Sequence, residues 1–303
     1  MDMAPQFGIR GVLPIIPTIF DHSGAIDERG VVAVVEYIIS AGADGVVFPG
    51  LASEYDMLSE AERLFLTKRI GALVDGRVKF IVGATADTPE SAIVYAQAGA
   101  DAGACAAMIL TPHAFADDLP AMSEFYAKVG RVSGIPIMLQ NAPRPMGIGL
   151  DLHAVAQIAK DVTNIRYVKE EAAPSGQRIT KLTALAGDTL DAVFGGAGAR
   201  YVIDELKRGA LGTMPACEIT EVHVAMLRLF KTGNEDAARD LFERTLPLLN
   251  VQANFRWHLT KNILVRRGLI DHPFVRAAGP GLDSHDLAEI DFLLNRLSDI
   301  VTL

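Results

Sequence analysis

The chain has 303 residues, of which 50% are hydrophobic and 21% are charged. A compact chain of this length removes roughly three quarters of its unfolded surface from water, so disordered and fibrous classes are excluded. The 28 basic and 37 acidic residues give a net charge of -9. Because there is no basic run, nucleic acid is not an expected partner.

The cysteine content and the apolar runs indicate where the protein acts. Cys105 and Cys217 are too few and too far apart for a disulfide framework or a cysteine-based metal site, and they fit a reducing cytoplasm. Residues 1–10 contain no basic flank leading into an apolar stretch, and charged residues or glycines interrupt every long apolar run. Neither export nor membrane spanning is predicted, and we expect a cytoplasmic protein.

Eight short apolar runs alternate with longer segments of helical period. This alternation is typical of parallel strands that are buried on both faces and joined by crossover helices. The runs begin near residues 12, 44, 79, 106, 135, 165, 191 and 210. From 12 to 210 is 198 residues over seven intervals, about 28 per unit, which matches one strand plus one helix of an α/β fold, the TIM (β/α)8 barrel.

The segments between the runs carry helix-start signals. Ser59 and Glu62 have the spacing of a capping box, in which each side chain accepts a hydrogen bond from a free backbone amide. Thr88 followed by Pro89 predicts an N-cap with proline at the first helical position. Apolar residues at helical spacing within residues 31–39 predict a helix face that packs on the core.

Four further stretches of helical period follow the eighth run without intervening strands: residues 219–230, 235–249, 253–267 and 287–301. We assign the first to the barrel, which then spans residues 1–232. The other three form a helical C-terminal extension, residues 233–303. No linker or low-complexity segment separates the two parts, so we expect them to form one domain.

Catalytic groups of such a barrel come from the carboxyl ends of the strands and from the loops that follow them. Among nine lysines, only Lys169 ends an apolar strand run, residues 165–168. Desolvation at the barrel mouth disfavours the ammonium form, and the free amine can attack a ketone to form a Schiff base. The resulting iminium stabilises an adjacent carbanion.

A structural interpretation of Lys169 is equally compatible with its position. Its side chain can reach solvent while Glu170 and Glu171 begin a solvated loop. Adjacent carboxylates favour the ammonium form, so desolvation has to outweigh them for Lys169 to act as a nucleophile. Strand alternation predicts that Glu170 points away from Lys169.

Motifs spread over nearly the whole chain resemble the dihydrodipicolinate synthase and N-acetylneuraminate lyase family of class I aldolase-like barrels. The matching segments are residues 11–14 with Phe20, Gly24 and Asp27, then residues 43–46, 53–54, 58–63, 168–170 and 209–212. The resemblance implies that Lys169 forms a Schiff base with a 2-keto acid. It also implies a homotetramer or dimer.

Two strand ends depart from the family pattern. Where the family has Tyr-Asn-x-Pro, with the tyrosine as proton shuttle, this chain has Gln140 and Asn141 followed by Ala-Pro. A glutamine can orient a water molecule or a substrate hydroxyl but does not titrate near neutral pH. After the second strand the family has Gly-Thr-Thr-Gly-Glu, and its threonines hold the substrate carboxylate. Residues 50–54 of this chain are Gly-Leu-Ala-Ser-Glu, in which Ala52 has no hydroxyl and only Ser53 retains one.

One branch of the family resembles this chain more than the synthases do. It contains 2-keto-3-deoxy sugar acid dehydratases such as 2-keto-3-deoxyarabonate dehydratase, and the likeness lies in residues 140–143 and in the prolines of the first strand. In that branch the iminium acidifies the C3 proton and hydroxide leaves. The branch has acidic residues after the seventh strand, where this chain has Ala197 and Gly198.

Four other residues are candidates for contact with the substrate. Gly195 and Gly196 can let the backbone approach a ligand, or can simply form a turn. Arg144 lies one position before the family's carboxylate-binding arginine, and an exposed loop arginine is the alternative. His113 is a candidate proton carrier because the unperturbed pKa of histidine lies near neutrality, although a packed or solvent-facing histidine is the favoured interpretation.

Metal and cofactor motifs are absent from the sequence. The seven histidines form neither His-x-His nor His-Glu-x-x-His, and there is no glycine-rich phosphate fingerprint. We therefore expect neither a metal nor an organic cofactor.

The sequence predicts a lyase that acts on a small 2-keto acid, pyruvate or a keto-deoxy sugar acid, through Lys169. Dehydration of a 2-keto-3-deoxy sugar acid is the first expectation, then pyruvate-dependent aldol chemistry, then dihydrodipicolinate synthesis. The alternative from another class is a keto-acid-binding barrel without turnover, which Gln140, Leu51 and Ala52 favour.

Overall fold

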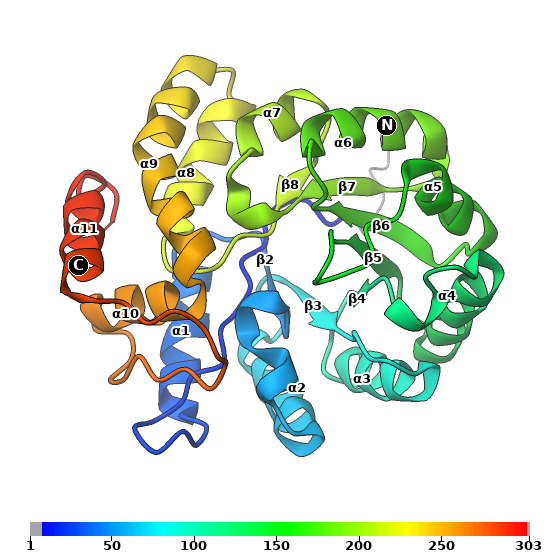
Figure 1. Cartoon of the computed structure of the whole chain (residues 1–303), viewed down its shortest axis with the longest axis horizontal. Helices are drawn as coiled ribbons and strands as arrows, with labels where there is room; N and C mark the ends of the chain where they lie inside the picture. The colour runs from blue at the N-terminus through cyan, green and yellow to red at the C-terminus, as the bar shows by residue number, and fades with distance from the viewer. Residues whose placement is uncertain (1–7, 302–303) are drawn as a thin grey trace.

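The computed structural model describes residues 8–301, in which eight parallel strands form one sheet in the order β1-β8-β7-β6-β5-β4-β3-β2 (Figure 1). A parallel bridge between Ile15 and Val47 brings the chain after β1 beside β2, so the sheet is nearly closed. The predicted TIM barrel is confirmed. The strands are β1 (Gly11–Val12), β2 (Gly45–Phe48), β3 (Lys79–Gly83), β4 (Ala106–Leu110), β5 (Ile137–Asn141), β6 (Ile165–Glu170), β7 (Ala192–Gly195) and β8 (Gly212–Thr213).

Helices follow the strands around the outside of the barrel. They are α1 (Glu28–Ser40), α2 (Glu60–Val74), α3 (Pro89–Asp101), α4 (Leu119–Ser133), α5 (Leu152–Asp161), α6 (Ser175–Ala186), α7 (Val202–Lys207) and α8 (Thr220–Lys231). The capping box of Ser59 and Glu62 at the start of α2 is confirmed, as is the Thr88 cap of α3.

The core has an inner layer and an outer layer. Side chains inside the barrel come mainly from alternate strand residues such as Val47, Ile81, Met108 and Phe194. A larger apolar layer lies between the strands and the surrounding helices. Because both faces of the sheet are buried, the strands are nearly continuous apolar runs, as the sequence indicated.

Three helices follow α8: α9 (Glu235–Phe255), α10 (Trp257–Arg266) and α11 (Ser284–Asn295). The expected boundaries of these segments were partly wrong. The first helix continues to residue 255, where Arg256 takes a positive φ of 44° and ends it. The last begins earlier, because Asp283 and Asp286 form a capping box, and ends at residue 295 rather than 301.

The C-terminal helices gather on one side of the barrel, where α9 packs against α8 (Figure 1). Buried side chains of α8, α9, α10 and α11 share one apolar cluster with residues of α7 and β1. No helix within residues 8–301 combines the length and apolar character needed to cross a bilayer. Residues 1–7, which belong to the segment in which the sequence predicts no export signal, lie outside the described part of the chain.

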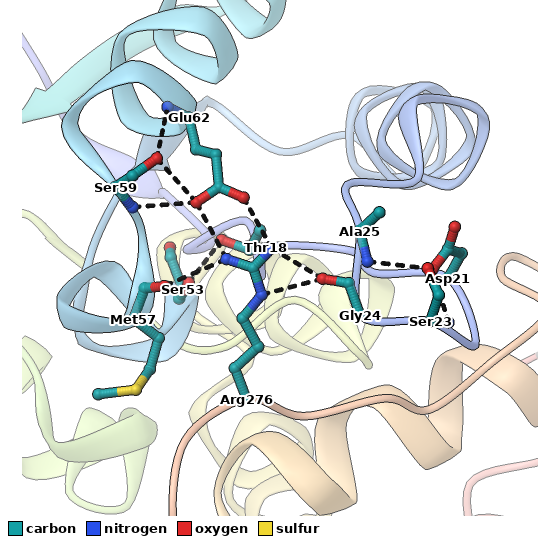
Figure 2. Close-up of polar contacts among 10 residues, drawn as sticks. All are labelled: Thr18, Asp21, Ser23, Gly24, Ala25, Ser53, Met57, Ser59, Glu62 and Arg276. Atoms are coloured by element: carbon teal, nitrogen blue, oxygen red, sulfur yellow. Dashed lines mark hydrogen bonds and ion pairs between the residues drawn. The ribbon is translucent and has the colours of Figure 1, made fainter.

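The segment after α10 holds the loop that follows β2. Figure 2 shows the guanidinium of Arg276 donating to the backbone oxygens of Gly24 and Met57 and to the carboxylate of Glu62. Glu62 also caps α2, and the hydrogen bond from Arg276 lowers its pKa to about 2. The C-terminal segment therefore fixes the position of the loop between β2 and α2.

Candidate active site

Lys169 lies at the carboxyl end of β6, where it pairs in register with Gln140 of β5 and Phe194 of β7. Its side chain is only 3% exposed, and Nζ lies 2.5 Å from Oε1 of Glu171. The amine is therefore held inside the barrel mouth and does not extend to bulk solvent.

Glu171 is the functional candidate that the sequence interpretation missed, because it was treated only as the start of a loop. It is the first residue after β6, and its side chain is 6% exposed. Period-two alternation along the strand is the signal that could have found it, since residues 169 and 171 share a face. A buried carboxylate within hydrogen-bonding distance of the amine can accept its proton.

Gln140 contacts Glu171, and it does not line the cavity of about 350 Å³ that opens above Lys169. Its Nε2 donates to Oε1 of Glu171 over 2.9 Å, and its side chain is buried. One carboxylate oxygen therefore accepts from both Lys169 and Gln140. The arrangement makes Gln140 a residue that orients Glu171.

Glu170 points to the opposite face of the strand, as alternation predicts. Its carboxylate accepts hydrogen bonds from Asn141 Nδ2 at 2.9 Å and from Arg178 Nε at 3.0 Å. Asn141 also exchanges two hydrogen bonds with the backbone of Leu150. Burial raises the pKa of Glu170, while Arg178 and Asn141 act in the other direction. Asn141 thus braces β5 against β6 and does not line the cavity.

The glycines at the end of β7 make room for two carboxyl groups. A Cβ at Gly196 would lie 2.3 Å from Cγ of Glu171, and one at Gly195 would lie 1.8 Å from Oε2 of Glu205. Glu205 accepts a hydrogen bond from Ser175, and burial raises its pKa to about 7. The structure therefore places both predicted glycines against carboxylates; Gly198, two residues further, lines the cavity.

A cavity of about 350 Å³ opens above Lys169 and Glu171, large enough for a small keto acid. Apolar side chains from β-strand ends form part of its wall, among them Ile15, Met214 and Ala216. Of the predicted substrate-binding residues, Ala52 lines this cavity.

The remaining predicted residues lie outside the cavity lining. Ser53 is fully buried, and its hydroxyl donates to the carbonyl of Ile16 and accepts from the amide of Gly50. Thr18 donates in turn to the carbonyl of Ser53, as Figure 2 shows. His113 and Arg144 are exposed. Ser53 therefore shapes the loop after β2.

The C-terminal extension supplies the far wall of the cavity. Gln252 and Arg256 come from the end of α9, and Trp257 and Thr260 from α10. Trp257 Nε1 donates to the carbonyl of Leu51 over 2.9 Å, which joins this wall to the loop after β2. No sequence motif marks these residues, because they reach the site only through the packing of the extension on the barrel.

The side chains of residues 8–301 contain no group of three or more His, Cys, Asp or Glu positioned to hold a metal ion. The ionisable groups that line the cavity are Lys169, Glu171, Arg200 and Arg256. These groups suit an anionic organic ligand.

Fold and site together define a (β/α)8 barrel with a small-molecule cavity at the carboxyl ends of its strands, the place of the active site in enzymes of this fold. The model of the dihydrodipicolinate synthetase family matches residues 8–287, so the chain belongs to that family. The resemblance found in the sequence motifs is thereby confirmed.

Individual relatives cover most of the chain. L-2-keto-3-deoxyarabonate dehydratase of Azospirillum brasilense is 28% identical over 296 residues, 96% of each chain. A 4-hydroxy-tetrahydrodipicolinate synthase of Methanothrix thermoacetophila is 32% identical over 243 residues, 79% of this chain and 80% of that one. The crystal structure of dihydrodipicolinate synthase from Rhodopseudomonas palustris superposes with a TM-score of 0.88 at 26% identity, covering 95% of this chain and 98% of that chain.

Proposed function

We propose that this protein is a lyase that forms a Schiff base between Lys169 and a 2-keto acid, and that it dehydrates a 2-keto-3-deoxy sugar acid. The observation that carries the proposal is the buried pair of Lys169 and Glu171, 2.5 Å apart, beneath a cavity of small-molecule size. The similarity to L-2-keto-3-deoxyarabonate dehydratase supports the choice of substrate class.

Glu171 can serve both stages of the reaction. It first takes a proton from the ammonium of Lys169, and the free amine then attacks the C2 carbonyl to give a carbinolamine. The carboxyl of Glu171 returns this proton to the carbinolamine oxygen, which leaves as water to give the iminium, and Glu171 is again a carboxylate. Glu171 next removes a proton from C3, and the electron pair flows into the iminium to form an enamine. Glu171 then donates the proton taken from C3 to the C4 hydroxyl, and the enamine expels this group as water.

The carboxylate of Glu171 takes the place of the missing tyrosine. Gln140 cannot exchange a proton, but its amide fixes the oxygen of Glu171 that also faces Lys169. A titratable group thus stands within reach of the Schiff-base nitrogen, which favours an enzyme over the keto-acid-binding barrel.

Aldol chemistry is the second candidate function, because the same iminium can instead lose the C3–C4 bond. A base then takes the proton of the C4 hydroxyl, an aldehyde leaves, and the enamine of pyruvate stays on the lysine. Dihydrodipicolinate synthesis ranks third, although a synthase is among the relatives, since the tyrosine of the family is replaced by Gln140. We further propose that the protein is cytoplasmic and assembles as a homotetramer or dimer, as the family resemblance implies.

The test compares Glu171→Gln with wild type on a 2-keto-3-deoxy sugar acid. We expect dehydration to fall at least about 10²-fold, because general acid–base catalysis contributes roughly that much, while borohydride still traps pyruvate on the variant. Glu289→Gln, an exposed residue of α11, is the matched control and should keep wild-type turnover.

The products distinguish the candidate reactions. Consumption of the sugar acid without pyruvate release supports dehydration, and release of pyruvate supports aldol cleavage. If Glu171→Gln dehydrates the sugar acid at the wild-type rate, the assignment of Glu171 as the acid–base group is wrong.

A further inference from the structure

The cavity has its reactive groups on one side and the C-terminal extension on the other. Lys169 and Glu171 lie at the end of β6, are 3% and 6% exposed, and form the floor of the cavity. Residues 252–257, where α9 ends and α10 begins, contribute to the lining of the same cavity, and we call them the junction.

The junction contacts the loops that follow three different strands. Trp257 Nε1 donates to the carbonyl of Leu51, after β2, over 2.9 Å. Nη2 of Arg256 lies 3.2 Å from Sδ of Met146, after β5. A Cβ at Gly198, after β7, would lie 3.4 Å from a side-chain oxygen of α9. Because such loops extend beyond the carboxyl ends of the strands, the junction covers the barrel mouth, and a ligand held at the floor extends toward it.

Two arginines of this cavity have no counter-ion. Arg256 belongs to the junction, and Arg200 follows the short helix η5 (Ala197–Ala199), against which α9 packs. Neither guanidinium forms an ion pair with any described carboxylate, and Nε of Arg200 is buried without a hydrogen-bond partner. Since Lys169 and Glu171 pair with each other, both guanidinium charges remain uncompensated. A partly desolvated guanidinium gains most from a charge-assisted bond, so this lining favours an anionic group.

The reacting end of a 2-keto acid has other donors. Its C1 carboxylate is attached to the carbon that Lys169 attacks, so it stays near the floor of the cavity. The amides of Leu51 and Ala52, two residues that line the cavity, donate no hydrogen bond to any described residue and are free to bind it. The two arginines are therefore left for a second charge further along the ligand.

We propose that Arg256 and Arg200 bind an anionic group at the end of the substrate remote from the keto carbon. The substrate is then a 2-keto-3-deoxy sugar acid that carries a second, terminal acidic group, and its two negative charges match the two uncompensated guanidinium groups. The planar guanidinium suits a carboxylate or a phosphate. This end distinguishes the substrate from 2-keto-3-deoxyarabonate, which ends in a hydroxymethyl group. The inference rests on the proposed function for the keto-acid end of the ligand.

The test compares 2-oxoadipate with 2-oxohexanoate, which have the same six-carbon chain and differ only in a terminal carboxylate or methyl group. Borohydride trapping at increasing concentration gives the half-saturating value of each acid. We expect wild type to be half-saturated by 2-oxoadipate at a concentration at least about tenfold lower, the gain of one charge-assisted contact. This advantage should disappear in Arg256→Gln, which keeps a side chain on the backbone of positive φ.

Arg200→Gln provides a second variant, and we expect it to reduce the same advantage. The half-saturating concentration of pyruvate, which has no remote group, should stay at its wild-type value in both variants. Arg131→Gln, at an exposed arginine of α4, is the control and should keep the preference for 2-oxoadipate. Thermal unfolding of each variant shows whether a loss comes from the contact or from the fold.

Turnover identifies the terminal group. The substrates are six-carbon 2-keto-3-deoxy sugar acids that end in a hydroxymethyl group, a carboxylate or a phosphate. A higher kcat/KM for the carboxylate or for the phosphate supports the inference and tells which anion the arginines bind. Equal kcat/KM for all three substrates would overturn it.

Calorimetric titration of Lys169→Met, with and without Arg256→Gln, separates the inference from the proposed function. Tighter binding of 2-oxoadipate through Arg256, by a protein whose wild type traps no keto acid, would contradict the lyase proposal and leave the anion site in place. Three outcomes of trapping would overturn the inference and leave the lyase proposal in place: equal half-saturation by both six-carbon acids in wild type, a preference that persists in both arginine variants, or an equal loss for pyruvate.

Discussion

The molecule contains two buried lysine–glutamate pairs that differ in what surrounds them. Lys261 and Glu54 are both fully buried, and each has further hydrogen-bond partners. Lys261 also donates to the carbonyl of Phe274, and the second oxygen of Glu54 accepts from the amides of Arg276 and Ala277. Lys169 and Glu171 have Gln140 as a further partner and open onto the cavity.

The difference teaches that burial alone does not identify a reactive lysine. Desolvation lowers the pKa of Lys261 to about 8, although Glu54 opposes the shift. Lys261 lines neither the cavity above Lys169 nor the smaller one beside Gln140. Lys169 is the candidate nucleophile because a substrate can reach it, and Lys261 instead fastens the C-terminal extension to the loop after β2.

Replacing each lysine with methionine tests most directly whether the two pairs have different roles. Lys169→Met should abolish turnover and lose less than about 2 kcal/mol of stability, since Glu171 keeps Gln140 and borders the cavity. Lys261→Met should lose about 3–5 kcal/mol, because a fully buried carboxylate loses its charged partner. Urea denaturation and turnover assays on both variants give the measurement.

A reversed order of the two stabilities would contradict this assignment. So would turnover of Lys169→Met above the background rate.

Gly196→Ala tests the second member of the Lys169–Glu171 pair. The new Cβ would lie 2.3 Å from Cγ of Glu171, so the carboxylate has to move away from Lys169. We expect turnover to fall at least about 10²-fold, the contribution of a positioned acid–base group, while the melting temperature changes little. Gly279→Ala, which meets no atom within 4 Å, is the matched control. Wild-type turnover in Gly196→Ala would show that the position of Glu171 is unimportant.

Glu218, a buried carboxyl group without an ion-pair partner within residues 8–301, predicts how the free energy of unfolding depends on pH. Burial raises the pKa of Glu218 to about 7, and its side chain accepts a hydrogen bond from Thr260. Because the folded pKa exceeds the unfolded value, this group's contribution is fully present below pH 4.5 and is lost as pH rises to 7, by at most about 3 kcal/mol. Urea denaturation between pH 4.5 and 8 should show a weaker decline for Glu218→Gln than for wild type, and parallel curves would contradict the assignment.

The sequence predicted the barrel and the position of Lys169 at a strand end because both depend on local patterns. The spacing of apolar runs fixes the (β/α)8 architecture, and strand alternation places Lys169 inward and Glu170 outward. The same alternation marks Glu171, but its position after the strand made a solvated loop the simpler interpretation.

The far wall of the cavity could not be predicted because it depends on long-range packing. Arg256 and Trp257 lie about 90 residues beyond Lys169 and reach the site only because the extension packs against the barrel. Ser53 and Asn141 looked like substrate contacts, yet their polar atoms are used by neighbouring backbone and side-chain groups. Hydrogen-bond satisfaction of this kind is visible only in three dimensions.

The central claim is that Lys169 forms the Schiff base, and peptide mapping after borohydride reduction with pyruvate tests it most directly. We predict a stable adduct on the peptide that contains Lys169, with none on the peptide that contains Lys261, and no adduct in Lys169→Met. An adduct elsewhere in a folded protein, or no adduct in wild type at saturating pyruvate, would contradict the account.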